Sequence, residues 1–210
     1  MTTTINRRFT PGSASFTAKT NEWPGCVPDT RWISEQGGIR SVLMYTDGAA
    51  PNNGQLGVRA GCGIILFPGH HLSFALERIP GKPITSNRAE LRAPCVALKL
   101  RHWKGEGFKR VVIATDSEYV VRGISEYIFN WKQNGWRNSR GHPVANKDLW
   151  LMLLEYVEDY EKQGTQVQFC LIPREQNQAA DLAARKGAEM PQNETQFRQI
   201  IHMPSILMDL

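Results

Sequence analysis

Val42-Leu-Met-Tyr-Thr-Asp-Gly-Ala-Ala50 is an apolar run that ends at an acid followed by glycine. Residues 41–46 alternate and are mostly apolar, which predicts a strand. Asp47-Gly48 is a turn signal, and the segment 51–54 is rich in loop residues. In the simplest interpretation Asp47 only suits a turn between two strands. Alternatively, Asp47 is a carboxylate held at the end of a buried strand, which other acids converging on it would favour.

Composition limits the classes of protein that fit. The 210 residues provide for one ordinary domain plus tails, and 41% apolar residues are enough for a core. No apolar run approaches the roughly 18 residues of a membrane-spanning helix. The net charge of +5 weakly favours an anionic partner. The four cysteines form no Cys-x-x-Cys pair and accompany no secretory signal, so we expect a reducing, intracellular compartment, either nucleus or cytoplasm.

Both ends of the chain lack a sustained hydrophobic period. We therefore expect residues 1–37 to form a disordered or weakly ordered tail, with one domain over 38–188 and a second tail over 189–210. The chain has no acid before Glu22, so a mitochondrial targeting segment remains an alternative for the first tail. The apolar stretch from Ile200 to Leu210 is expected to dock on the domain.

The central region predicts three strands joined by hairpins, followed by strands joined through helices. Such a pattern gives an α/β fold with a mixed sheet and helices packed on it. The expected strands are about 41–47, 60–67, 71–78, 110–115 and 166–172. The expected helices begin near 86, 117, 147 and 175, and the last of them should end before Gly187, which suits a helix terminus.

Three further acids occur near strand ends or helix starts, and each has an ordinary explanation. Glu90 fits a capping box with Asn87, and Asp116 suits a helix start after a buried strand. Asp181 can pair with Arg185 one helical turn later. If these acids converge on Asp47, however, four carboxylates would repel one another, and divalent cations are the usual remedy.

The chain resembles type 1 ribonuclease H over about residues 40–188. The resemblance rests on motifs that occur in the family's order: Thr46-Asp-Gly48, Ser86-Asn-Arg-Ala-Glu-Leu91, Thr115-Asp-Ser117, Trp131-Lys-Gln-Asn-Gly-Trp-Arg137, Val144-Ala-Asn-Lys-Asp-Leu-Trp150 and Asn177-Gln-Ala-Ala-Asp-Leu-Ala183. It implies a ribonuclease H-like fold with a five-stranded mixed sheet whose first three strands are antiparallel.

The resemblance implies endonucleolytic cleavage of the RNA strand of an RNA–DNA hybrid, leaving 5′-phosphate and 3′-hydroxyl ends. Two Mg²⁺ ions, or Mn²⁺, would be held by four acids and the backbone of Gly48. The four acids are Asp47, Glu90, Asp116 and Asp181. Asp47, at the centre, would bridge both ions. The alternative function is a nucleic-acid-binding domain of the same fold that does not cleave.

The resemblance also implies a set of contacts to the hybrid, made by a protein that is expected to be monomeric. Positions near the 2′-hydroxyl, which distinguishes RNA from DNA, match Asn53, Ser86 and Asn87, and phosphate-gripping positions match Thr85 and Asn146. The matching aromatic and basic residues are Trp131, Trp136, Lys132, Arg137, Arg140, His142 and Lys147. Core packing is an alternative for Trp131, and a merely solvated charged face is an alternative for the cations.

Three features depart from the family pattern. Ser86 replaces the more common Asn, and Pro94 falls inside the first long helix, where it should produce a kink. No histidine lies between His142 and His202, although many relatives carry one before the fourth acid. Arg174 is the nearest matching side chain, and it could assist product release as a fixed positive donor. Pairing with Glu175 or solvent is the alternative.

Overall fold

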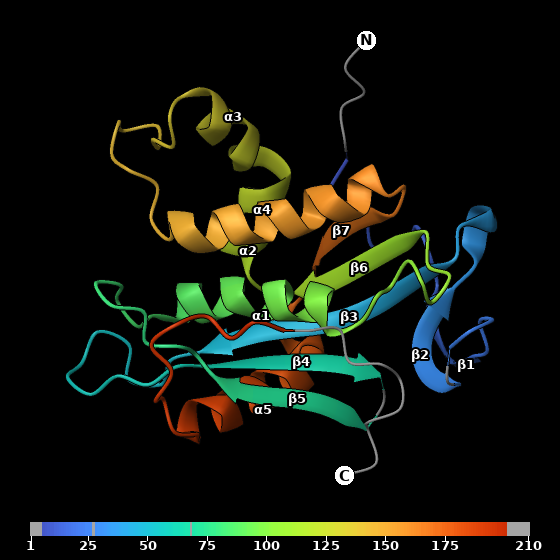
Figure 1. Cartoon of the computed structure of the whole chain (residues 1–210), viewed down its shortest axis with the longest axis horizontal. Coiled ribbons are helices and arrows are strands. Elements are labelled where there is room, and N and C mark those ends of the chain that lie inside the picture. Colours follow the sequence, from blue (N-terminus) through green and yellow to red (C-terminus); the bar gives the residue numbers. More distant parts are fainter. Residues whose placement is uncertain (1–5, 27, 68, 201–210) are drawn as a thin grey trace.

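The computed structural model describes residues 6–26, 28–67 and 69–200, which are built around one seven-stranded sheet (Figure 1). The strands are β1 (Thr17–Asn21), β2 (Asp29–Ser34), β3 (Ser41–Ala49), β4 (Gly61–Phe67), β5 (His70–Ala75), β6 (Arg110–Thr115) and β7 (Gln166–Leu171). Neighbours from β1 to β5 are antiparallel, whereas β6 runs parallel to both β3 and β7.

Strand β3 is the centre of this topology. Residues 45–49 of β3 pair with β4, and residues 41–43 pair with β2. Residues 41–45 also pair with β6. Because a strand has only two edges, β2 and β4 share one edge of β3 and β6 takes the other. The carboxyl end of β3 therefore lies beside that of β6.

Helices cover both faces of the sheet. They are α1 (Ser86–Leu100), α2 (Glu118–Arg122), α3 (Ile128–Gln133), α4 (Lys147–Lys162) and α5 (Gln178–Glu189), with a π-helical turn over Gly123–Tyr127 and 3₁₀ turns over Gln36–Gly38 and Arg174–Gln176. Helices α1 and α4 pack together over the large core, which includes Val111 and Ile113 of β6. The alternate residues Val112 and Ala114 face a second apolar cluster. Strand β6 is thus buried on both faces, as its continuous apolar run predicts.

Helix α5 lies very close to β4, and glycine makes this approach possible. A Cβ added at Gly63 would lie 2.3 Å from the carbonyl oxygen of Ala180. We had expected α5 to end before Gly187, but the helix continues to Glu189. Gly187 lies against β5, where an added Cβ would be 2.5 Å from the carbonyl oxygen of Phe74. This glycine therefore serves close packing rather than helix termination.

The predicted mixed sheet is confirmed, and two strands that we had not predicted extend it. Strands β1 and β2 fall inside residues 1–37, which we had expected to be weakly ordered. They form an antiparallel hairpin that joins β3 through β2. Helix α1 continues through Pro94, and Thr85, rather than Asn87, is its N-cap, because the Thr85 side chain accepts a hydrogen bond from the backbone of Arg88 at 3.3 Å.

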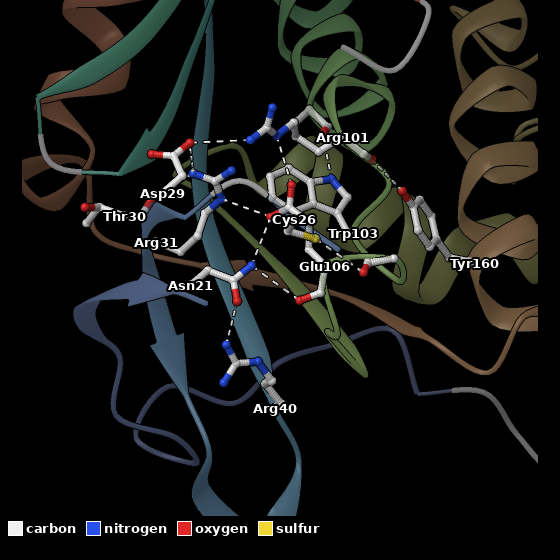
Figure 2. A network of polar contacts seen from close by, with 12 residues as sticks. Asn21, Cys26, Asp29, Thr30, Arg31, Arg40, Arg101, Trp103, Glu106 and Tyr160 are labelled. Atoms are coloured by element: carbon white, nitrogen blue, oxygen red, sulfur yellow. Dashed lines mark hydrogen bonds and ion pairs between the residues drawn. The ribbon is translucent and has the colours of Figure 1, made fainter. Parts of the chain in front are cut away.

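A buried network of charged side chains fixes the hairpin to the loop after α1 (Figure 2). Arg31 of β2 is 1% exposed and contacts Asp29 at 2.7 Å and Glu106 at 3.3 Å. Arg101 donates to the other oxygen of Glu106 at 2.9 Å, and Asn21 of β1 also contacts Glu106. Buried charges are tolerated when they are paired in this way. The hairpin is therefore an integral part of the fold.

The chain after α5 also docks on the domain. The backbone of Arg78, just after β5, donates to the carbonyl oxygen of Glu194 at 2.8 Å. The fully buried ion pair of Arg92 and Glu77 is covered by this segment, since both side chains also contact the backbone of Arg198. Ile200 packs against the core, while the rest of the predicted docking stretch lies outside the described residues. No helix in the described ranges is long and apolar enough to cross a membrane.

Candidate active site

Four acidic side chains from four different elements line one cavity of about 450 Å³. Asp47 comes from β3, Glu90 from α1, Asp116 from the position directly after β6 and Asp181 from α5. These are the four acids that the sequence predicts to converge. The cavity lies where the ends of β3 and β6 meet the start of α1.

Asp47 is the most buried of the four acids, with 8% of its surface exposed. The predicted turn at this position is wrong, because β3 continues to Ala49 and Asp47 pairs with Gly63 of β4. Burial raises the pKa of Asp47 from its ordinary value of 3.8 to about 7, and the charge of Asp116 adds to the effect. The next residue, Gly48, must lack a side chain, since an added Cβ would lie 2.1 Å from the backbone nitrogen of Glu90.

Glu90 is held by a neighbouring hydroxyl. The Ser117 hydroxyl donates to its Oε2 at 2.6 Å. Burial raises the pKa of Glu90, and the hydrogen bond from Ser117 opposes the rise. Because Thr85 caps α1, the carboxylate of Glu90 is not engaged in the predicted capping box and remains available to the cavity.

Asp116 is held by a residue to which the sequence analysis assigned no role. The buried amide of Asn177 donates to Asp116 Oδ1 at 2.6 Å and to the carbonyl oxygen of Thr46 at 3.1 Å. Asn177 is the residue before α5, and it therefore links this helix to β3 and to the acid that follows β6. Its place in the quoted motif was the available signal, but nothing in the local pattern revealed a partner 61 residues away.

Asp181 contacts two arginines. Arg185 donates to its Oδ2 at 2.7 Å, which is the helical pairing weighed as the ordinary explanation. Arg174 lies 3.7 Å from Oδ1 and also lines the cavity, although its side chain is largely exposed. A cationic side chain thus stands at the rim beside the fourth acid.

The donor chemistry of the cavity fits hard divalent cations. Carboxylate oxygens are the ligands that Mg²⁺ and Ca²⁺ prefer. The pKa of Asp47 is raised by burial and, to a smaller extent, by the charges of the neighbouring acids, which a cation would offset. In the part of the chain that the structure describes, no group of three or more His, Cys, Asp or Glu side chains is already gathered around one point. Asp181, for example, forms an ion pair with Arg185. The residues fit a metal, and side-chain rearrangement would have to complete its ligand shell.

Of the three residues predicted to lie near the 2′-hydroxyl, one lines the cavity. Ser86 lines it, while Asn87 is exposed at the start of α1 and Asn53 is exposed in the loop after β3. Thr85 is occupied as the N-cap. Asn146 begins α4 with a left-handed backbone, φ +58°, and its side chain contacts both Arg88 and Tyr119. Arg88, which we had not singled out, also makes a bidentate ion pair with Asp148.

Except for Lys147, the first residue of α4, the predicted basic and aromatic contacts lie on a separate projection, residues 128–146, which we call the binding arm. It comprises α3 and the loop leading to α4, and lies beside α4 in Figure 1. Trp131 packs edge-to-face on the buried Trp150, with ring centroids 5.3 Å apart, so the core-packing alternative holds for much of its surface. Trp136 is half-buried and receives Lys147 over its ring at 5.6 Å.

The cations of the binding arm are exposed. Lys132 contacts Glu158 of α4 at 2.9 Å, and Arg137 donates to the carbonyl oxygen of Gly141 at 2.7 Å. Arg140 and His142 are exposed in the same loop. None of these four side chains lines the acidic cavity. The structure thus separates a cluster of acids from an arm of cations and indole rings.

Asp47 lies on β3, and Asp116 directly follows the neighbouring parallel strand β6. Together with the acids of two flanking helices in one cavity, this arrangement defines a protein of the ribonuclease H-like fold class. A family model described as RNase H matches residues 40–189. Ribonuclease H1 of Mus musculus is 37% identical over 157 residues, which cover 73% of this chain and 52% of that protein. Ribonuclease H of Actinobacillus succinogenes is 35% identical over 164 residues, covering 76% and 98%.

Among solved structures, foamy viral protease-reverse transcriptase in complex with RNA/DNA hybrid matches with a TM-score of 0.53 and 25% identity. This match covers 70% of our chain and 20% of that chain. The chain therefore belongs to the RNase H family, and the resemblance to its type 1 members is confirmed. It spans about half the length of the mammalian relatives that it matches.

Proposed function

We propose that the protein is an endonuclease that hydrolyses the RNA strand of RNA–DNA hybrids with divalent metal ions. The convergence of Asp47, Glu90, Asp116 and Asp181 on one cavity carries this proposal. The comparisons support it in two ways. The relatives in sequence are ribonucleases H, and one relative in structure is in complex with an RNA/DNA hybrid. A hybrid-binding domain without cleavage is less well supported, because all four acids are present and line one cavity.

The four acids would hold two Mg²⁺ ions, with Mn²⁺ as a substitute, and the backbone of Gly48 would assist. Bound divalent ions supply an activated water and neutralise the departing oxygen, which gives 5′-phosphate and 3′-hydroxyl ends. The protein's own contribution is orientation. Ser117 fixes the carboxylate of Glu90, and Asn177 fixes that of Asp116 against the backbone of β3.

Recognition of the hybrid is assigned to residues beside the cavity and on the binding arm. Ser86, Asn87 and Asn53 would contact the RNA strand near the 2′-hydroxyl, a group that DNA lacks. Thr85 and Asn146 would face phosphates of the DNA strand, with Asn146 oriented by Arg88. The indole rings of Trp131 and Trp136, together with Lys132 and Arg137, would hold the DNA strand at a distance from the acids.

Cleavage of labelled substrates tests the proposal directly. An RNA–DNA hybrid, double-stranded RNA and double-stranded DNA are incubated with the protein, with and without Mg²⁺. We expect cleavage of the hybrid's RNA strand only, dependent on Mg²⁺ and abolished in Asp116→Asn. Binding of the hybrid without cleavage would instead support the non-cleaving alternative.

The salt dependence of hybrid binding tests the cations of the binding arm. Each phosphate contact that is lost should lower the slope of log K against log salt by about 0.9. We expect the triple change of Lys132, Arg137 and Arg140 to alanine to flatten this slope, whereas Lys162→Ala at the exposed end of α4 should not. An unchanged slope would show that the three cations form a merely solvated face and do not contact phosphates.

Arg174 is proposed to assist product release. It stands at the cavity rim 3.7 Å from Asp181, and a guanidinium can attract a phosphate without exchanging a proton. Product release often limits kcat, so Arg174→Ala should lower the multiple-turnover rate more than the single-turnover rate. An equal fall of both rates, or no change in either, would refute this role.

A further inference from the structure

Residues 6–9 extend the sheet beyond β7, outside the part of the chain that matches the family model. The backbone of Phe169 donates to the carbonyl oxygen of Arg7 at 2.8 Å, and Phe9 donates back to that of Phe169 at 2.9 Å. Arg8 forms a parallel bridge with Phe169. This short stretch therefore occupies the free edge of β7, beside α4 and the start of the binding arm.

The side chain of Arg7 is inserted between this edge and two helices. It is 3% exposed and binds Glu161 of α4 through two hydrogen bonds, both of 2.9 Å. Its guanidinium carbon also lies 5.4 Å from the ring centroid of Phe129 in α3. Because the two hydrogen bonds of a bidentate arginine–carboxylate pair are parallel, they fix the orientation of the guanidinium as well as adding energy. Arg7 thus joins the sheet edge to α4 and to the helix at the base of the binding arm.

A second contact reaches the turn just before α3. Arg8 donates to Glu126 of the π-helical turn at 2.6 Å, and Arg122 of α2 lies 3.9 Å from the other oxygen of Glu126. Both Arg8 and Glu126 are partly exposed, so this ion pair alone contributes little stability. Its value is geometric, because it ties the N-terminal stretch to the turn that leads into the binding arm.

Arg7 also shares an acid with a cation of the binding arm. Glu158 lies 2.9 Å from Lys132 and 3.9 Å from Arg7. Arg7 and Lys132 therefore balance two of the acids of α4, Glu158 and Glu161. Without Arg7, Lys132 would be the one cation left to offset these two charges, and a net negative charge would remain beneath the arm. Such a charge would hold Lys132 back from a phosphate and repel an anionic duplex.

We propose that the side chains of Arg7 and Arg8 form a brace for the binding arm, and that Arg7 is a positioning residue for nucleic-acid binding. Arg7 acts through Phe129, which sets the placement of α3, and through Glu158, which also forms an ion pair with Lys132. The consequence for hybrid binding rests on the function proposed above. The brace itself does not, because it consists of contacts within the protein.

Hybrid binding and hydrogen exchange are measured together to test the brace. Binding is followed by fluorescence anisotropy of a labelled hybrid, with every protein carrying Asp116→Asn to prevent cleavage. Arg7→Ala should raise Kd at least about fivefold, the lower end of ordinary coupling between sites. The backbone amides of α3 should exchange faster, while those of α5 should not change. In the cleaving protein, KM should rise and kcat should stay within about twofold.

Phe9→Leu is the matched control. Phe9 lies two residues away and is equally buried, but it packs on Val112, Ala114 and Cys170 rather than on α3. We expect it to lower Tm while leaving Kd within about twofold. If Arg7→Ala fails to fold, Arg7→Lys keeps the charge without the fork and should raise Kd by a smaller factor.

Three results would overturn the brace. In the first, folded Arg7 variants keep both Kd and the exchange of α3 within about twofold of the parent. In the second, Phe9→Leu weakens binding as much as Arg7→Ala at a similar loss of Tm, so that global stability explains both. In the third, exchange speeds up equally in α3 and α5. A parent protein that neither binds nor cleaves the hybrid would instead refute the proposed function, and hydrogen exchange alone would then decide the brace.

Discussion

Replacing Asp47 with asparagine should stabilise the metal-free protein at neutral pH. Asp47 is almost fully buried, and burial together with neighbouring acids raises its pKa from 3.8 to about 7. Asparagine removes the charge while its amide oxygen can still accept the 2.8 Å hydrogen bond from the backbone of Gly48. Asp47, the acid at the centre of the proposed chemistry, therefore lowers the stability of the metal-free folded protein.

The size of this effect follows from the two pKa values. The interval from 3.8 to about 7 corresponds to about 4 kcal/mol, at 1.36 kcal/mol per pKa unit. Local relaxation and water entry reduce this ceiling, so we expect a gain of about 2 kcal/mol. In a chain of this size that gain raises Tm by about 4–8 °C.

The pH dependence gives the prediction its sign. Because the pKa is higher in the folded protein, the folded state binds more protons than the unfolded state between pH 3.8 and about 7. Stability of the parent therefore falls as pH rises through this window. The advantage of Asp47→Asn should be full at pH 8 and small at pH 4, where Asp47 is protonated in the folded protein and partly protonated in the unfolded chain.

Thermal melting in EDTA at pH 8 and pH 4 is the assay. Asp159→Asn, the same chemical change at an exposed position of α4, is the control and should shift Tm by no more than about 2 °C. Mg²⁺ should raise the Tm of the parent more than that of Asp47→Asn. The reasoning fails if Asp47→Asn melts at or below the parent at pH 8, or if its advantage is the same at both pH values.

Two further changes test the packing and the site. Gly63→Ala should lower the free energy of unfolding by about 1–3 kcal/mol or more, because its Cβ would lie 2.3 Å from the carbonyl oxygen of Ala180; an unchanged denaturant midpoint would contradict this. Asn177→Ala should lower kcat with little change in KM, because Asp116 loses its 2.6 Å hydrogen bond, whereas the exposed neighbour Gln178→Ala should match the parent in steady-state kinetics.

The acids could be predicted from the sequence because each stands beside a strong local signal. Asp116 follows a continuous apolar strand, and Glu90 lies one turn inside a helix with a clear start. Local signals could not predict where the pairing of strands in the tertiary structure overrides them. The Asp47-Gly48 turn signal lost to the pairing of β3 with β4, because pairing with Gly63 and Cys62 extends the strand through both residues.

The N-terminal hairpin was missed for a different reason. Strand β1 has exposed side chains at its first four positions, so it carries no apolar alternation to find. The buried partners that hold the hairpin are charged, and hydrophobic periodicity does not register Arg31 or Glu106 as core residues. Only the tertiary structure shows that these charges neutralise each other out of water.

The segments outside the matched range complete the sheet. An unpaired strand edge is a liability in water, and residues 6–9 cover the outer edge of β7 while residues 190–200 cover the chain just after β5. Phe9 also covers Val112 and Ala114 on the face of the sheet that α5 leaves open. The brace on the binding arm therefore follows from a requirement of the fold itself. Once an arginine is placed beside α4 to close the edge of β7, it also lies beside Glu158, the acid that pairs with Lys132.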